Sequence, residues 1–122
     1  ILLAEDNELN MEIAEFMLQN EGADVTKAWN GREAVEIFRK SEPDEFDVIL
    51  MDIMMPVMNG YEATKMIRSL EREDAKTIPI IAMTANAFTE DRLKAKEAGM
   101  DEHIAKPVDP ELLVKVIYES VD

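Results

Sequence analysis

Short apolar runs alternate five times with longer amphipathic stretches in this chain of 122 residues, and this alternation restricts its possible folds most. A short continuous apolar run is typical of a strand covered on both faces, whereas apolar residues spaced three and four apart indicate a helix. The predicted strands are residues 1–4, 23–29, 46–51, 78–83 and 103–105. The predicted helices lie around residues 9–17, at 31–40, 61–73 and 89–98, and from Pro110 onward.

Five strand–helix pairs with short connections favour one α/β domain over residues 1–122. Parallel strands need right-handed crossovers, so the helices should form two layers around a parallel sheet. Gly22 and Gly99 are expected to end helices, and Asp109 should cap the last helix with Pro110 at its first position.

The first helix has apolar residues on more than one side. Leu9, Ile13, Phe16 and Met17 have the spacing of a single helical face, which we expect to be buried. Residues 11 and 18 (Met11 and Leu18) would then lie on the opposite, outer side.

The composition excludes several classes of function. With 27 acidic and 13 basic residues the formal net charge is −14, which argues against binding to nucleic acid or to an anionic membrane. The absence of cysteine excludes disulfides and thiolate metal sites, and a single histidine excludes a His-rich zinc site. The sequence contains no apolar stretch long enough to cross a membrane and no secretory signal. Its start at Ile1, inside an apolar run, suggests a piece of a longer protein.

Polar residues come directly after four of the five predicted strands. The carboxyl ends of parallel strands meet at one edge of the sheet, where ligands bind. Singly, each residue has a simpler explanation, such as a helix cap for Asp6, a turn hydroxyl for Thr84 or a solvated lysine for Lys106. Together they predict one compact site with a formal charge of about −2. The residues are Glu5, Asp6, Asp52, Thr84 and Lys106.

Three neighbouring carboxylates raise one another's pKa unless a cation compensates them. Oxygen ligands in this small number suit Mg²⁺. A carboxylate beside Mg²⁺, with a lysine and a hydroxyl nearby, is equipped to accept a phosphoryl group.

Four motifs, spread over essentially the whole chain, resemble the receiver domain of two-component response regulators. They are Ala4-Glu5-Asp6-Asn7, the run from Ile49 to Gly60, Met83-Thr84-Ala85 and Lys106-Pro107. The runs at 5–10, 84–87 and 99–102 are most similar to receivers of hybrid sensor histidine kinases. The resemblance implies a flavodoxin-like fold with sheet order 2-1-3-4-5.

The resemblance also implies a role for each site residue. Asp52 would be the nucleophile that becomes aspartyl phosphate, Lys106 would pair with a phosphoryl oxygen, and the Thr84 hydroxyl would move to another. Asp6, Asp52 and the backbone carbonyl of Met54 would bind Mg²⁺, or Mn²⁺ in its place, and Glu5 would act mostly through a bound water.

The same resemblance implies the kind of partner. The phosphodonor would be a phosphohistidine on a kinase or phosphotransfer protein, for which a small acyl phosphate could substitute. Its helices would pack on the first helix, where Met11 and Leu18 are the expected contacts. The resemblance implies a cytoplasmic domain, compatible with a membrane-anchored parent protein and with a dimer that forms on phosphorylation.

Two positions depart from the family or vary within it. His103 stands where the family usually has tyrosine or phenylalanine, a ring that turns inward as the threonine moves. We hypothesise that His103 is a pH-sensitive switch. The alternative is an ordinary histidine at the surface or the rim of the site. Met54, two residues after Asp52, cannot orient a water, which predicts slow self-dephosphorylation.

Other functions remain as alternatives. A degenerate receiver would act only as an interaction module. A haloacid-dehalogenase-like phosphatase needs a second acid where Met54 stands, and a flavodoxin-like flavin site would meet an acidic loop at residues 5–8. The favoured interpretation is a domain that catalyses its own phosphorylation and dephosphorylation and is not a turnover enzyme on a separate substrate.

Overall fold

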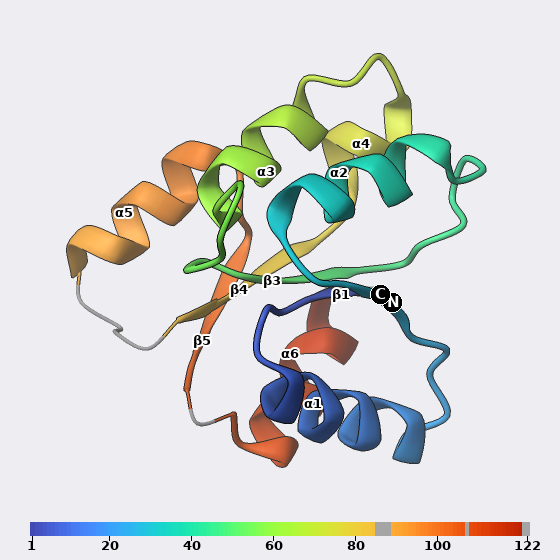
Figure 1. The fold of residues 1–122 in the computed structure, drawn as a ribbon, viewed down its shortest axis with the longest axis vertical. Helices are drawn as coiled ribbons and strands as arrows, with labels where there is room; N and C mark the ends of the chain where they lie inside the picture. Colours follow the sequence, from blue (N-terminus) through green and yellow to red (C-terminus); the bar gives the residue numbers. More distant parts are fainter. Residues whose placement is uncertain (85–88, 107, 121–122) are drawn as a thin grey trace.

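The computed structural model describes residues 1–84, 89–106 and 108–120, which form a five-stranded parallel sheet (Figure 1). The strand order β2-β1-β3-β4-β5 confirms the expected topology. Most strands are shorter than the apolar runs that predict them. The strands are β1 (Leu2–Ala4), β2 (Thr26–Ala28), β3 (Ile49–Asp52), β4 (Ile80–Thr84) and β5 (Glu102–Ala105).

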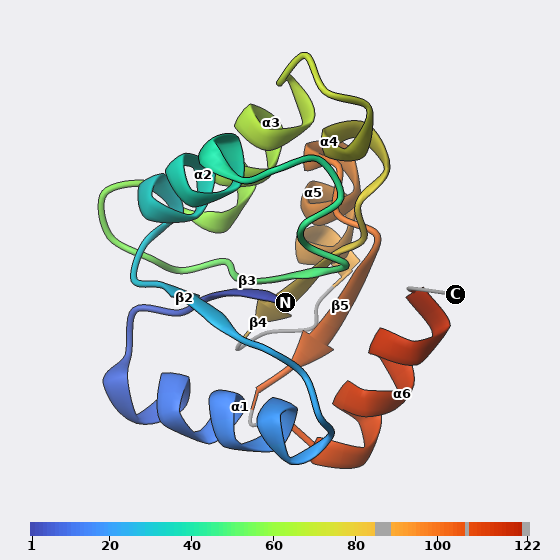
Figure 2. The ribbon, with the colours of Figure 1, turned by 90° about the vertical axis from the view of Figure 1, so that its right-hand side faces the viewer.

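Helices cover both faces of the sheet, as Figures 1 and 2 show. One layer consists of α1 (Glu8–Asn20) and α6 (Pro110–Ser120). The other consists of α2 (Gly31–Lys40), α3 (Gly60–Arg68), α4 (Glu73–Thr77) and α5 (Thr89–Ala98). Within the described part of the chain, no helix is long and apolar enough to cross a membrane.

The predicted helix at 61–73 is too long, because α3 ends at Arg68 and α4 begins only at Glu73. Ser69 is the C-cap of α3, and its hydroxyl and amide both donate to backbone carbonyls of the last turn. Arg72 is extended, with φ −140° and ψ 140°, and α4 begins after it. The apolar spacing of Met66, Ile67 and Leu70 gave no sign of this break.

The other helix ends show the expected chemistry. The Asp109 carboxylate accepts the Glu111 amide at 2.9 Å and so caps α6. Gly22 and Gly99 have φ of +84° and +110°, which is why glycine ends α1 and α5.

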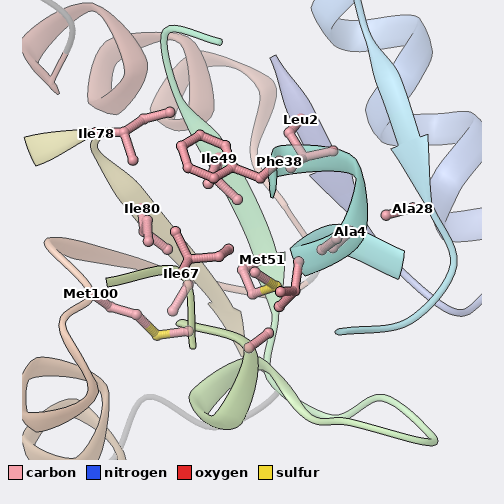
Figure 3. Close-up of a cluster of buried hydrophobic side chains, with 14 of the residues drawn as sticks. Leu2, Ala4, Ala28, Phe38, Ile49, Met51, Ile67, Ile78, Ile80 and Met100 are labelled. Carbon is pink, nitrogen blue, oxygen red and sulfur yellow. The ribbon is translucent and has the colours of Figure 1, made fainter. Parts of the chain in front are cut away.

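Two apolar cores lie on opposite faces of the sheet, because successive residues of a strand point to opposite sides. The core under α2 and α3 contains Leu2, Ala4, Phe38, Ile49, Met51, Ile67 and Ile80 (Figure 3). The core under α1 and α6 contains Leu3, Met11, Leu18, Leu50, Ile81, Met83, Ile104 and Leu113.

The buried face of α1 is not the predicted one. Leu9, Ile13 and Phe16 are exposed, Phe16 to 70%, and of the predicted set only Met17 packs on the core, half-buried. Met11 and Leu18 are buried, Leu18 to within 2%. Apolar residues surround this helix, so positions 11, 14 and 18 satisfy the helical period as well as 9, 13 and 16. The path from β1 into the helix turns positions 11, 14 and 18 toward the sheet. Positions 9, 13 and 16 remain as an exposed stripe.

Candidate functional site

The carboxyl ends of the strands bring the predicted side chains to one edge of the sheet. Glu5 comes directly after β1 and Asp52 ends β3, next to each other because Ala4 pairs with Met51. Thr84 ends β4, and its carbonyl accepts the Lys106 amide at 2.7 Å. Four strands therefore contribute to one site, as their order in the sheet requires.

Lys106 lies between two buried carboxylates. Its Nζ is 3.0 Å from Glu5 Oε1 and 3.0 Å from Asp52 Oδ2. Glu5 and Asp52 are each only 2% exposed, so two negative charges share one positive charge away from water. Such a group is stable only with a further compensating charge or a bound proton.

The pKa values show where that proton is held. Burial and the neighbouring Glu5 raise the pKa of Asp52 to about 7, against the opposing influence of Lys106. Burial favours a higher pKa for Glu5 too, but hydrogen bonds with Asp52 and Lys106 leave its pKa below the usual value. The two carboxylates outweigh burial at Lys106 and raise its pKa. Near neutral pH, Asp52 therefore shares a proton with Glu5.

A cation could replace this proton. Glu5, Asp6 and Asp52 each offer a carboxylate oxygen, and these oxygens lie within 4.8 Å of one another. Asp6 is exposed beside the two buried acids, which leaves the group open to solvent on one side. Hard oxygen donors in this number fit Mg²⁺, which keeps several of its own waters.

Neighbouring asparagines cap the helices and leave the aspartates available. Asn7 Oδ1 accepts the Asn10 amide at 2.9 Å, so Asn7 and not Asp6 caps α1. Asn59 caps α3 in a reciprocal capping box with Glu62. The structure thus removes the simpler explanation of Asp6 as a helix cap.

A tight loop joins Asp52 to α3. Val57 has φ +68°, which is strained for a β-branched residue, and the Met58 amide donates to the Pro56 carbonyl at 2.7 Å. A Cβ at Gly60 would lie 2.4 Å from the Asp52 carbonyl oxygen, so only glycine lets α3 begin this close to β3. Met54 lies in the loop with its side chain 77% exposed. The sequence around Met54 gave no signal of the strain at Val57.

His103 lies on β5 beside α5. Arg92 Nε donates to His103 Nε2 at 2.8 Å, a partnership that the sequence did not indicate. Burial and the Arg92 charge lower the pKa of His103, against Glu102. The motif residues 85–87 and Pro107 lie outside the described residues.

A cavity of about 360 Å³ opens beside the acidic group. Glu5 and Lys106 form part of its wall, and Ile13 and Met17 of α1 and Val108 form another part. It therefore connects the exposed stripe of α1 with the acidic site.

Comparisons with known proteins agree with this geometry. The response regulator receiver domain model matches residues 1–118. The hybrid signal transduction histidine kinase I of Dictyostelium discoideum is 41% identical over 99% of this chain, which spans only 7% of that kinase.

Solved structures agree as well. The receiver domain of sensor histidine kinase PA1611 from Pseudomonas aeruginosa PAO1, with magnesium coordinated in its active-site cleft, has TM-score 0.88 and 38% identity. That match covers 98% of this chain and 94% of PA1611's. The Saccharomyces cerevisiae receiver domain of Ssk1, crystallised with the histidine phosphotransfer protein Ypd1, has TM-score 0.88 and 33% identity, over 98% and 86% of the chains.

The buried acidic group at the carboxyl edge of a 2-1-3-4-5 sheet and these matches lead to the same conclusion: this chain belongs to the response regulator receiver domain family.

Proposed function

We propose that Asp52 accepts a phosphoryl group from a phosphohistidine. The observation that carries this proposal is the position of its carboxylate, 2% exposed and 3.0 Å from Lys106 Nζ. An Asp52 oxygen bonds to phosphorus, the bond between phosphorus and the donor's imidazole nitrogen breaks, and its electron pair returns to that imidazole. The product is an aspartyl phosphate.

The residues around Asp52 prepare this transfer. Lys106 is already at the carboxylate and pairs with a phosphoryl oxygen, while the Thr84 hydroxyl, at the end of the neighbouring strand, meets another. Asp6, Asp52 and the Met54 carbonyl would hold Mg²⁺, or Mn²⁺ in its place, and Glu5 would act through a water. When bound, the ion neutralises phosphoryl oxygens and orients the incoming group.

The exposed stripe of α1, formed by Leu9, Ile13 and Phe16, is the proposed docking surface for the phosphodonor. Ile13 of this stripe lines the cavity whose wall includes Glu5 and Lys106, so a partner on the stripe would lie close to the residues that contact Asp52. The yeast complex of Ypd1 with an Ssk1 receiver supports a histidine phosphotransfer protein as the kind of partner. The buried Met11 and Leu18 cannot make this contact.

Transfer from phosphorylated Ypd1, used as a probe, tests donor and docking surface together. Wild-type protein should gain the phosphoryl group and Asp52→Asn should not. Phe16→Ser should slow transfer about tenfold or more, because exposed aromatic anchors carry much of the energy of such contacts. Met66→Ser removes an equally apolar exposed side chain from the other helix layer and serves as the control.

Labelling by acetyl phosphate separates the two claims. Phe16→Ser should react with acetyl phosphate at the wild-type rate, because its acceptor site is intact. Equal loss of transfer in Phe16→Ser and Met66→Ser would contradict the docking surface, and absence of transfer from both donors to wild-type protein would contradict the function.

The reaction also implies the wider role of the domain. The domain modifies itself, so we do not expect turnover of a separate substrate. We expect the domain in the cytoplasm, where its phosphohistidine donor would be. We also expect phosphorylation to switch the binding of the domain to partners or to a second copy of itself. The chain spans 7% of the Dictyostelium kinase. That the parent protein is itself a hybrid histidine kinase is therefore also a proposal.

A further inference from the structure

A side-chain hydrogen bond connects α5 with β5 through a titratable ring. Arg92 Nε–H donates to His103 Nε2 at 2.8 Å, from the exposed side of α5 to a half-buried position on β5. Since Nε2 accepts this hydrogen bond, the ring is neutral and carries its proton on Nδ1. His103 is the one histidine of the sequence.

The sheet places this ring close to the acidic site. Ile104 belongs to the core under α1 and α6, so the neighbouring His103 points to the opposite face, toward α5. His103 pairs in register with Ala82, and Thr84 lies two residues beyond Ala82 on the same strand face. Because Thr84 pairs with Ala105, His103 and Thr84 are diagonal neighbours on that face of the sheet.

We propose that the Arg92–His103 hydrogen bond is a pH-sensitive latch between α5 and β5, closed when His103 is neutral and open when His103 is protonated. Protonation puts a hydrogen on Nε2 that faces the Arg92 Nε–H, so two donors and two positive charges oppose each other. The contact cannot persist in that state, and α5 loses this attachment to β5. This inference does not depend on phosphorylation of Asp52.

The charged groups around the ring do not replace the lost bond. The groove between α5 and β5 contains Arg92 and Lys96 on the helix and Asp101 and Glu102 on the strand side. Asp101 already has partners of its own, because its Oδ2 accepts from Arg68 at 2.9 Å and from the Ile80 amide at 2.9 Å. Glu102 favours the imidazolium, but partial burial and the Arg92 charge oppose it.

The pH effect has a definite direction. Burial, then Arg92, lowers the pKa of His103 below its ordinary value near 6.5. In the unfolded chain the ring takes up a proton at a higher pH than in the folded protein. The latch is therefore closed at neutral pH, and it opens as the pH falls through the lowered pKa.

NMR of the full chain tests the latch without a partner, because one histidine gives one set of ring signals. Nitrogen-15 coupling patterns should show the Nδ1–H tautomer in wild-type protein at pH 8. In Arg92→Met the His103 ring should return to Nε2–H, the tautomer that a free imidazole prefers. The affinity of the ring for a proton should rise about threefold or more, which is about half a pKa unit.

Lys96→Met is the matched control, since it removes a cation from the same groove and leaves the hydrogen bond in place. It should keep the Nδ1–H tautomer. An Nε2–H tautomer in wild-type protein, or an identical tautomer and titration in wild type and Arg92→Met, would overturn the latch.

Hydrogen exchange tests the structural consequence. Protection of α5 amides, corrected for intrinsic exchange, should fall severalfold in wild-type protein between pH 7 and pH 5. His103→Phe cannot take up a proton and should show no such fall. Equal pH dependence in both proteins would show that His103 does not control the attachment of α5. Circular dichroism would verify that each variant is folded.

Discussion

Lys106 Nζ lies 3.0 Å from Asp52 Oδ2 and equally close to Glu5, so one ammonium group holds two buried carboxylates together. Asp52, the proposed acceptor, is thereby held in place and its charge is partly compensated. A dianionic phosphoryl group arriving at Asp52 would need the same compensation.

Lys106→Met should lose phosphoryl transfer and keep metal binding. Removal of a charged hydrogen-bond partner costs about 1.5–3 kcal/mol, so labelling of Asp52 by acetyl phosphate should slow about tenfold to a hundredfold. Mg²⁺ affinity measured by calorimetry should stay equal or rise, because a competing positive charge is gone. Unchanged labelling would show that the lysine only holds the carboxylates in place.

Asp52→Asn should stabilise the metal-free fold, and more so at higher pH. The carboxyl of Asp52 ionises near pH 7 when folded and near 3.8 when unfolded. The folded protein therefore holds more protons between these values, and its stability falls as the pH rises through this range. Asn cannot ionise, so the variant should exceed wild type by about 1 kcal/mol or more at pH 8.

Urea unfolding with a chelator at pH 5 and pH 8 measures this difference. Glu97→Gln, at an exposed position, is the control. The free energy of unfolding of this variant should not gain on that of wild type between pH 5 and pH 8. A gap between Asp52→Asn and wild type that is constant from pH 5 to pH 8 would contradict the buried, shared proton.

Arg72 should be essential to stability. Its guanidinium donates to the carbonyls of Phe38, Ser41 and Glu42, pairs with Asp74 through two nitrogens and lies 4.7 Å over the Phe38 ring. It thus joins the end of α2 to α4.

Arg72→Lys should lower the free energy of unfolding by about 2–4 kcal/mol, because an ammonium cannot reproduce this set of bonds. Arg39→Lys, at an exposed pair with Glu36, should change it by less than about 0.5 kcal/mol. Chemical denaturation compares the two, and similar small effects would mean that Arg72 is not an anchor.

The sheet and the site could be predicted from the sequence because both depend on the order of the strands. Buried strands such as Ile49–Asp52 are continuous apolar runs, and parallel pairing brings the residues at the carboxyl end of each strand to one edge. On this basis the sequence alone groups four residues at one site, before any interatomic distance is known: Glu5, Asp52, Thr84 and Lys106.

The remaining features depend on packing that local patterns do not encode. The sequence pattern predicts the wrong buried face of α1, because Met11 and Phe16 are both apolar and only the path from β1 decides between them. The break between α3 and α4 depends on Arg72, which binds the nearby Asp74 and also the carbonyls of Phe38 and Ser41, more than 30 residues away. Arg92 and His103 meet across 11 residues that include the turn into β5.

Met54 should slow the loss of the phosphoryl group. Its thioether is exposed beside the acceptor and cannot orient an attacking water as a carboxylate or amide does. Met54→Asn should shorten the lifetime of the aspartyl phosphate about tenfold or more. Met54→Leu is also apolar and should keep the wild-type lifetime, measured as loss of the added mass over time. Equal lifetimes in all three proteins would show that the Met54 side chain does not affect the loss of the phosphoryl group.

Intact mass after incubation with acetyl phosphate and Mg²⁺ is the decisive measurement for Asp52 as the phosphoryl acceptor. We expect one added phosphoryl group in wild-type protein, no gain when the metal is chelated, and no gain in Asp52→Asn. Addition to Asp52→Asn at the wild-type level would contradict Asp52 as the acceptor. Absence of any gain in wild-type protein, together with failure to bind beryllofluoride, would favour a module that only binds partners.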